Sequence, residues 1–165
     1  MLRISKLADY GIAIAVRLAA GQGADPGQDA WRSCSELSRD TSIPEPTVGK
    51  LLRRLARSGL LEARRGPAGG YRLARPAEDI SVAELLEALE GPLAVTDCVP
   101  GATGCDFEPH CDARQGWARI HDAVTSALHA VRLSEMVPAP RLVPLRAKAP
   151  ASVTGEPPLS PGREP

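Results

Sequence analysis

Cys98, Cys105 and Cys111 are three of the chain's four cysteines, and all three lie between residues 97 and 112. Glycine, proline and aspartate fill the gaps between them, so we expect the thiols on an irregular loop that can curl around a ligand. Cysteine thiolates bind iron–sulfur clusters and zinc. The stretch therefore predicts a metal or cluster site.

The spacing of these thiols leaves three interpretations open. Closed zinc sites usually contain CxxC pairs, and the stretch contains none, whereas iron–sulfur clusters are compatible with looser loops. The third interpretation is a thiol redox switch, or thiols without a ligand. A disulfide framework is disfavoured, because residues 1–9 are charged and amphipathic and lack the apolar region of a secretory signal. We expect a cytoplasmic protein and favour an iron–sulfur cluster.

The composition indicates a helical, soluble chain. Its 165 residues correspond to one domain with room for an appended helix or tail. Hydrophobic residues make up 43% of the chain and aromatic residues only 3%, and abundant alanine and leucine favour helices. No apolar run approaches the length of a membrane span, so no membrane partner is expected.

The charges divide the chain into a basic front and an acidic middle. Residues 1–75 carry 13 Lys and Arg against 7 Asp and Glu, whereas residues 76–137 carry 3 against 11. Between Lys50 and Arg75 there are eight basic residues and one acidic residue, Glu62. This distribution indicates that the front half meets an anionic partner, and double-stranded DNA is the first to consider.

The elements that must position these groups can be predicted from periodicity and caps. Apolar residues at helical spacing, capping boxes of the S-x-x-E type, and prolines confined to a first turn predict four helices, over residues 5–20, 33–40, 43–59 and 80–91. Two short alternating segments, 60–65 and 71–74, are joined by glycine-rich residues 66–70 and predict a β-hairpin. A phosphate-binding loop at 66–70 is disfavoured, because no helix carrying a lysine follows it.

Three helices followed by a hairpin are the order of a winged helix-turn-helix, so the fold class we expect is mainly α with a small β-hairpin wing. In such a motif the second helix enters the major groove, and its N-terminal side chains lie closest to the bases. The basic residues further along that helix are suited to phosphates, and the wing is placed to approach the DNA backbone or the minor groove. The predicted DNA contacts are Ser5, Lys6, Thr47, Lys50, Arg54, Arg57, Arg64, Arg65 and Gly69.

A further helix is expected over residues 113–131, with a narrow apolar stripe of Trp117, Ile120, Val124, Leu128 and Val131. This stripe favours pairing with a second copy in a homodimer, and the alternative is a helix packed on its own domain. The expected division is a DNA-binding domain (1–92), a cysteine loop (93–112), a dimerisation helix (113–137) and a disordered tail (138–165). The fourth cysteine, Cys34, is expected to be a packed core thiol.

Taken together, the helices, the stretch from Arg65 to Tyr71 and the three cysteines in order resemble the Rrf-type transcription regulators, the family of IscR-like and NsrR-like proteins. The resemblance spans residues 1–137 and is greatest to the regulators of the SUF iron–sulfur cluster assembly system. It implies a dimeric winged-helix regulator whose cluster, usually 2Fe–2S and in some members 4Fe–4S, is bound by Cys98, Cys105 and Cys111. It also implies that the cluster alters DNA binding.

The chain departs from the family pattern at two places. Where one branch has a histidine as fourth cluster ligand, this chain has Arg114, which cannot act as a ligand. Asp9 matches the aspartate that the nitric-oxide-sensing branch uses, and His110 is a local alternative. Gly49 stands where IscR-like members carry a base-contacting glutamate, so their operator preference is not carried over.

The function expected from the sequence is that of a homodimeric DNA-binding regulator, switched by an iron–sulfur cluster and controlling SUF genes. The alternatives are a nitric-oxide or redox-sensing repressor of the same family, or a zinc-binding interaction module. An enzyme is not expected, because no nucleophile–base pair, catalytic carboxylate pair or phosphate loop is recognisable.

Overall fold

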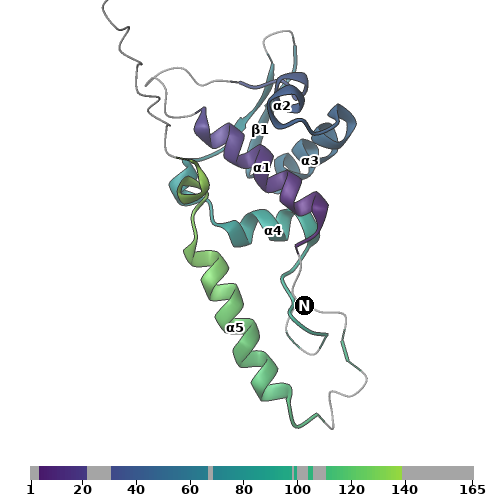
Figure 1. Cartoon of the computed structure of the whole chain (residues 1–165), viewed down its shortest axis with the longest axis vertical. Helices are drawn as coiled ribbons and strands as arrows, with labels where there is room; N and C mark the ends of the chain where they lie inside the picture. Colours follow the sequence, from purple (N-terminus) through teal and green to yellow (C-terminus); the bar gives the residue numbers. More distant parts are fainter. Residues whose placement is uncertain are drawn as a thin grey trace, which may run out of the picture.

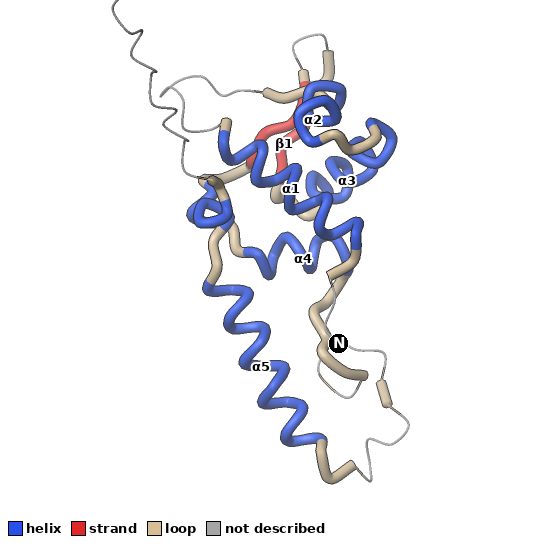
Figure 2. Tube along the Cα trace, in the orientation of Figure 1, coloured by secondary structure: helices blue, strands red, loops and turns tan. Residues whose placement is uncertain are grey.

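The structure is a computed structural model that describes residues 4–21, 31–66, 69–97, 99, 104–105 and 111–138. Figures 1 and 2 show a helical head that contains one hairpin, and a long helix, α5, that projects from it. The predicted order of helices and hairpin is confirmed. Of the tail expected at 138–165, all but Pro138 lies outside the described residues. The elements are α1 (Lys6–Ala20), α2 (Cys34–Thr41), α3 (Glu45–Arg57), β1 (Leu61–Arg64), β2 (Gly70–Leu73), η1 (Ala77–Asp79), α4 (Val82–Glu90), α5 (Arg114–Ala130) and η3 (Leu133–Met136).

The helices begin where their capping residues predict. The Ser33 hydroxyl accepts a hydrogen bond from the Glu36 amide at 3.2 Å, and the Glu36 carboxylate accepts one from the Ser33 amide at 2.7 Å. Ser81 and Glu84 form the same reciprocal pair at the start of α4. Each pair satisfies two amides that a helix start would otherwise leave without partners.

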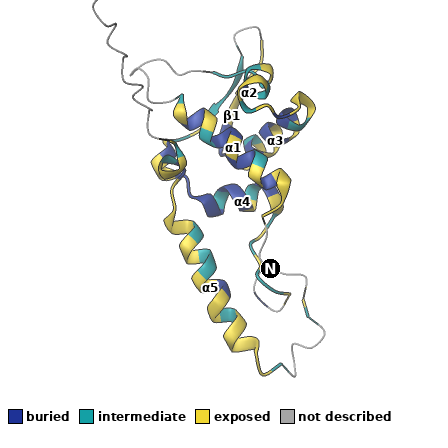
Figure 3. Cartoon of the chain, in the orientation of Figure 1, coloured by how far each residue is buried: buried dark blue, intermediate teal, exposed yellow. Residues whose placement is uncertain are grey.

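The core lies where α1, α3 and α4 meet, and Figure 3 shows the buried faces of these helices turned toward one another. Gly11 of α1 lies directly against Leu89 of α4, so closely that a Cβ at position 11 would overlap the leucine side chain. The glycine therefore sets the distance between these two helices. The fully buried large side chains include Ile14, Leu37, Leu52, Leu55, Ile80, Leu85 and Leu133.

The hairpin has one neighbour that the sequence did not reveal. β1 and β2 pair antiparallel, with Leu61 opposite Leu73 and Arg64 opposite Gly70. On the other side of β2, Arg32 and Tyr71 exchange two backbone hydrogen bonds, of 3.0 and 2.9 Å. The residues just before α2 therefore extend the hairpin by a third, very short strand and tie it to the helices.

α5 is attached to the head at its C-terminal end (Figure 1). The Val82 amide donates to the Val131 carbonyl at 3.0 Å, and the Leu133 amide donates to the Ile80 carbonyl at 2.8 Å. Val124 and Leu128 are half-buried, whereas Trp117 and Ile120, nearer the free end, are 38% and 45% exposed. The part of the stripe nearer the head therefore packs on its own domain, and pairing of the exposed part with a second copy stays a prediction. No described helix has the length and apolar character needed to cross a membrane.

Candidate nucleic-acid interface and cysteine loop

α3 has one buried face and one basic face. Its apolar side chains are buried in the core, while Lys50, Arg54 and Arg57 are exposed and Thr47 is half-buried. Positions 47, 50, 54 and 57 follow the helical repeat, so they lie on the side of the helix away from the core. The predicted contacts of this helix are therefore gathered on one exposed surface. The exposed Arg53 lies beside this surface and was not among them.

The N-terminal half of α3 packs against α2 through Gly49 and Cys34. A Cβ at Gly49 would lie 3.5 Å from the Cys34 sulfur, so little space remains at this contact. The Cys34 thiol donates to the Glu45 carbonyl at 3.4 Å, and burial, followed by the nearby Glu45 carboxylate, raises its pKa. Cys34 is a half-buried packing thiol, as the sequence predicted.

In the hairpin, the sequence predicted DNA contacts at Arg64, Arg65 and Gly69. Arg64 ends β1, the exposed Arg65 follows it, and Gly69 directly precedes β2. The guanidinium of Arg64 lies over the Trp31 ring at 4.7 Å from its centroid, and that of Arg72 lies over the same ring at 4.8 Å. Neither Trp31 nor Arg72 was singled out from the sequence, because their partners are far away along the chain.

Ser5 and Lys6 lie at the junction of α1 and α4. The Ser5 hydroxyl caps α1 by accepting from the Ala8 amide at 3.1 Å, and the Ser5 amide donates to the Glu90 carboxylate at 3.2 Å. The Lys6 ammonium lies 5.5 Å from the centroid of the Tyr10 ring. Both residues are exposed, on a different element from the stripe of α3.

An acidic side chain connects the helices to the hairpin. Asp40, near the end of α2, accepts from Arg17 of α1 at 3.0 Å and from Arg32 at 2.5 Å. These two guanidinium groups, Arg17 first, lower the pKa of Asp40 below its ordinary value although partial burial opposes the shift. Arg32 in turn pairs with the hairpin through its backbone.

Two of the three predicted cluster ligands lie within the described residues. Cys105 and Cys111 are free, half-buried thiols, and Asp9 is exposed in the first turn of α1. Cys98 and the alternative ligand His110 lie outside the described residues. Within the described ranges no three His, Cys, Asp or Glu side chains converge as a metal site would require. The two thiols match an iron–sulfur cluster in donor type, since thiolates are its usual ligands.

Two polar atoms on α5 are buried without a partner. His121 is 8% exposed, and among the described residues neither its Nδ1 nor the Thr125 hydroxyl has a hydrogen-bond partner. These residues are one helical turn apart, so they lie on the same face of α5. The sequence had assigned this face to apolar residues alone.

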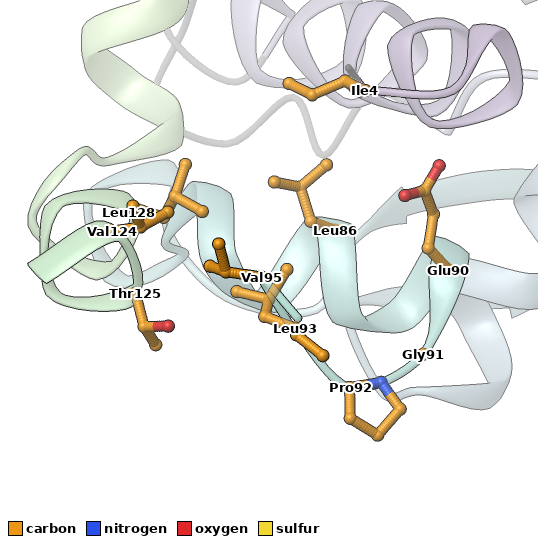
Figure 4. Close-up of a pocket in the computed structure, with 11 residues that line it drawn as sticks. Ile4, Leu86, Glu90, Gly91, Pro92, Leu93, Val95, Val124, Thr125 and Leu128 are labelled. Carbon is orange, nitrogen blue, oxygen red and sulfur yellow. The ribbon is translucent and has the colours of Figure 1, made fainter. Parts of the chain in front are cut away.

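A mainly apolar pocket of about 290 Å³ lies between the head and α5. Figure 4 shows Leu86 of α4, with Leu93 and Val95 of the following loop close to it and Ile4 above it. Val124, Thr125 and Leu128 close the side formed by α5. The chain thus exposes apolar surface between Ile4, the C-terminal half of α4 and α5.

Comparison with known proteins identifies relatives that match most of the chain. A family model described as Rrf2, iron-dependent transcriptional regulator, matches residues 4–139. The transcriptional regulator IscR of Cereibacter sphaeroides is 33% identical over 138 residues, which cover 82% of this chain and 87% of that protein. The IscR of Escherichia coli is 28% identical over 136 residues, covering 82% and 80% of the two chains.

Solved structures agree with these relatives. CymR, the global cysteine regulator of Bacillus subtilis, superposes with a TM-score of 0.64 at 30% identity, covering 82% of this chain and 96% of its own. IscR of T. potens superposes with a TM-score of 0.61 at 25% identity, covering 82% and 85%. The fold is therefore the winged helix that the sequence predicted, and the relatives are transcriptional regulators and not enzymes.

Proposed function

Because the chain belongs to the Rrf2 family of transcriptional regulators, we propose that it binds operator DNA as a homodimer under the control of an iron–sulfur cluster on residues 93–112. The observation that carries the DNA-binding part is the exposed basic stripe of α3, which lies opposite a fully apolar face. Any helix that packs on a core carries its charges on the solvent side, but here every charge after Glu45 is positive, which solvation alone does not require. The cytoplasm, where operator DNA lies, is the compartment that this function requires.

α3 is the recognition helix in this proposal. Its N-terminal half brings Thr47 and Lys50 toward the base edges of the major groove, while Arg54 and Arg57 bind phosphates. Each neutralised phosphate releases counterions, so the logarithm of the affinity falls with the logarithm of the salt concentration by about 0.9 per contact.

Titration of a labelled promoter duplex at several salt concentrations tests this assignment. Arg54→Ala and Arg57→Ala are expected to weaken binding to every sequence and to lower the salt slope by about one each. Lys50→Ala is expected to change the preference between sequences. The exposed Arg39 of α2 provides the control, because it lies outside the stripe. Unchanged slopes in both α3 variants would contradict the assignment.

A second copy of the chain is the proposed partner of the exposed apolar residues. Ile4 and Leu7 at the start of α1 are 52% and 43% exposed, and Trp117 and Ile120 are exposed on α5. Burial of apolar surface yields about 25 cal/mol per Å², so pairing of these residues would stabilise a dimer substantially. A dimer also presents two recognition helices to a two-fold operator.

Sedimentation velocity tests the dimer. Ile120→Asp places a charge in the proposed interface, and we expect it to yield a monomer that binds DNA weakly. Ser126→Asp is the matched control, because Ser126 is exposed on the side of α5 opposite the apolar stripe. A dimer that persists in Ile120→Asp would exclude this surface as the interface.

Cys98, Cys105 and Cys111 would hold the cluster, with Asp9 of the other copy or His110 as fourth ligand. When bound, the cluster supplies a group that is gained or lost with iron, sulfide and oxidant levels. The protein's part is to present the thiolates on the segment that lies between α4 and α5 in the sequence, so that a ligand bound there would affect both helices. The proposed cluster is of the 2Fe–2S type, and the genes controlled would be those of SUF cluster assembly.

Anaerobic purification followed by visible absorption, circular dichroism, and iron and sulfide assays tests this part. We expect cluster bands in wild type and their loss in Cys98→Ser, Cys105→Ser and Cys111→Ser. Cys34→Ser, on α2, should keep them. If the assays find stoichiometric zinc and no sulfide, the cysteines form a zinc site and the cluster proposal is wrong. Occupancy of cluster-assembly promoters in cells tests the proposed gene targets, and unbound promoters would refute them.

A further inference from the structure

We propose that Trp31 is a positioning residue for DNA binding, because its indole ring holds Arg64 in a fixed place on the wing for contact with a phosphate. The proposal rests on the DNA-binding function proposed above. It adds to that function a residue outside α3 and outside the hairpin. Three features support it: the stack itself, the space that Gly70 leaves for it, and the way Trp31 is anchored.

The stack consists of two cations over one aromatic ring. The guanidinium carbons of Arg64 and Arg72 lie 4.7 and 4.8 Å from the centroid of the Trp31 ring, within the range of cation–π attraction. Stacking uses the flat face of a guanidinium group, whereas its N–H donors lie in the plane. An arginine held by its flat face can still donate from its edges to a phosphate.

The register of the hairpin explains why the ring fits there. Glu62 pairs with Arg72, and Arg64 pairs with Gly70, so the side chains of these residues belong to one face of the hairpin. Gly70 contributes no side chain to that face. A Cβ at position 70 would lie 2.6 Å from the carbonyl oxygen of Arg32, so only glycine lets the segment of Trp31 approach.

Trp31 is anchored on the side of the helices. The next residue, Arg32, pairs with Tyr71 through two backbone hydrogen bonds and with Asp40 through its side chain. Ser33 then caps α2. The indole is therefore held in place at the start of the helix-turn-helix. Because Arg64 stacks on this ring, the side chain of Arg64 is held in place as well.

The charges around the ring favour a polyanion as the partner. Two guanidinium groups over one ring repel each other, and Glu62 offsets the charge of Arg72 through an ion pair of 2.8 Å. A phosphate next to Arg64 would lower this repulsion further. An arginine already held in place also loses less side-chain freedom when it binds a phosphate.

The test compares Trp31→Phe with Trp31→Leu, two replacements of which only phenylalanine keeps an aromatic face. Binding of each variant to a labelled duplex of the chain's own promoter is measured across a salt series, and circular dichroism establishes that each variant folds. We expect Trp31→Leu to weaken binding by about 2- to 5-fold and to lower the salt slope by about one. Trp31→Phe should stay close to wild type.

Arg64→Ala and the double variant Trp31→Leu/Arg64→Ala complete the cycle. If the ring acts through Arg64, the double variant binds no more weakly than Arg64→Ala alone. Additive losses, or a Trp31→Leu protein with unchanged affinity and slope, would overturn the proposal. Arg57→Ala serves as the reference. If Arg57→Ala binds more weakly but Trp31→Leu binds like wild type, the DNA-binding function stands and the role of Trp31 is rejected. If wild type does not bind the duplex, the DNA-binding function and the role of Trp31 are both rejected.

Discussion

Gly70→Ala should destabilise the protein, because Gly70 is where the segment before α2 approaches the hairpin most closely. Gly70 has a φ of +150°, which residues with a Cβ rarely adopt. The added Cβ would also lie 2.6 Å from the Arg32 carbonyl oxygen and 3.1 Å from the Ser33 amide nitrogen, and both are backbone atoms that cannot rotate away. We therefore expect the short strand at Arg32 to separate from β2.

The expected cost follows from two contributions. The strained backbone costs about 1–3 kcal/mol. Loss of the two Arg32–Tyr71 hydrogen bonds costs about 1 kcal/mol each. Together they lower the free energy of unfolding by about 3–5 kcal/mol. Gly59→Ala is the matched control, because Gly59 also has a positive φ, +77°, but has no atom within 4 Å of the added Cβ. Its backbone strain alone costs about 1 kcal/mol.

Urea unfolding at a fixed protein concentration measures the difference between the two variants, and amide hydrogen exchange locates it. The Arg32 and Tyr71 amides should lose their protection in Gly70→Ala and keep it in Gly59→Ala. Equal unfolding midpoints with both amides still protected would show that the approach of residues 31–33 does not require glycine at position 70.

Three further predictions concern other parts of the chain. Gly11→Ala should destabilise by about 1 kcal/mol, since overpacking against Leu89 costs about 1–3 kcal/mol and the gain in helix propensity offsets about 1 kcal/mol, whereas Gly116→Ala in α5, with open space around it, should stabilise by a similar amount. Urea midpoints of both variants check this, and a stabilised Gly11→Ala would refute the close contact. Burial raises the pKa of Glu84, but hydrogen bonds from the Ser81 amide and from Arg75 outweigh it and lower the pKa from 4.5 to about 2. Because the folded state holds the proton more weakly, this carboxylate stabilises the fold above about pH 4.5, and that contribution is lost as the pH falls toward 2. Glu84→Gln should therefore flatten the stability profile between these values, and a profile as steep as that of wild type would exclude Glu84 as a contributor. Trp117→Ala should lower dimer affinity without lowering the stability of the head, because Trp117 is exposed near the end of α5 distant from the head; sedimentation and thermal unfolding distinguish the two effects, and an unchanged dimer would remove Trp117 from the proposed interface.

The features predicted correctly from the sequence are those encoded over a few residues. Ser33 with Glu36 and Ser81 with Glu84 mark their helix starts within one turn, and the prolines at 44 and 46 restrict where α3 can begin. The stripe of Lys50, Arg54 and Arg57 follows from the same helical repeat that buries the opposite face. These patterns require no knowledge of what the helix packs against.

The features that were missed depend on residues far apart in the chain or on a residue type that the pattern discounted. The pairing of Arg32 with Tyr71, and therefore the stack on Trp31, joins segments that no local period relates. His121 follows Trp117 by four residues and precedes Val124 by three, so its position lies on the buried side of α5. A polar residue was not counted there, although the structure buries it.

The attachment of α5 gives the molecule a mechanical property. The helix of 17 residues extends for about 25 Å at 1.5 Å per residue, and its hydrogen-bonded pivot lies where Val131 and Leu133 meet Ile80 and Val82. Cys111 precedes the opposite end of the helix by three residues. In a rigid lever of that length, a rotation of about 10° at the pivot moves the far end by about 4 Å. A displacement at the cysteine end would therefore reach the first turn of α4 as a small rotation of the segment that carries Val131 and Leu133.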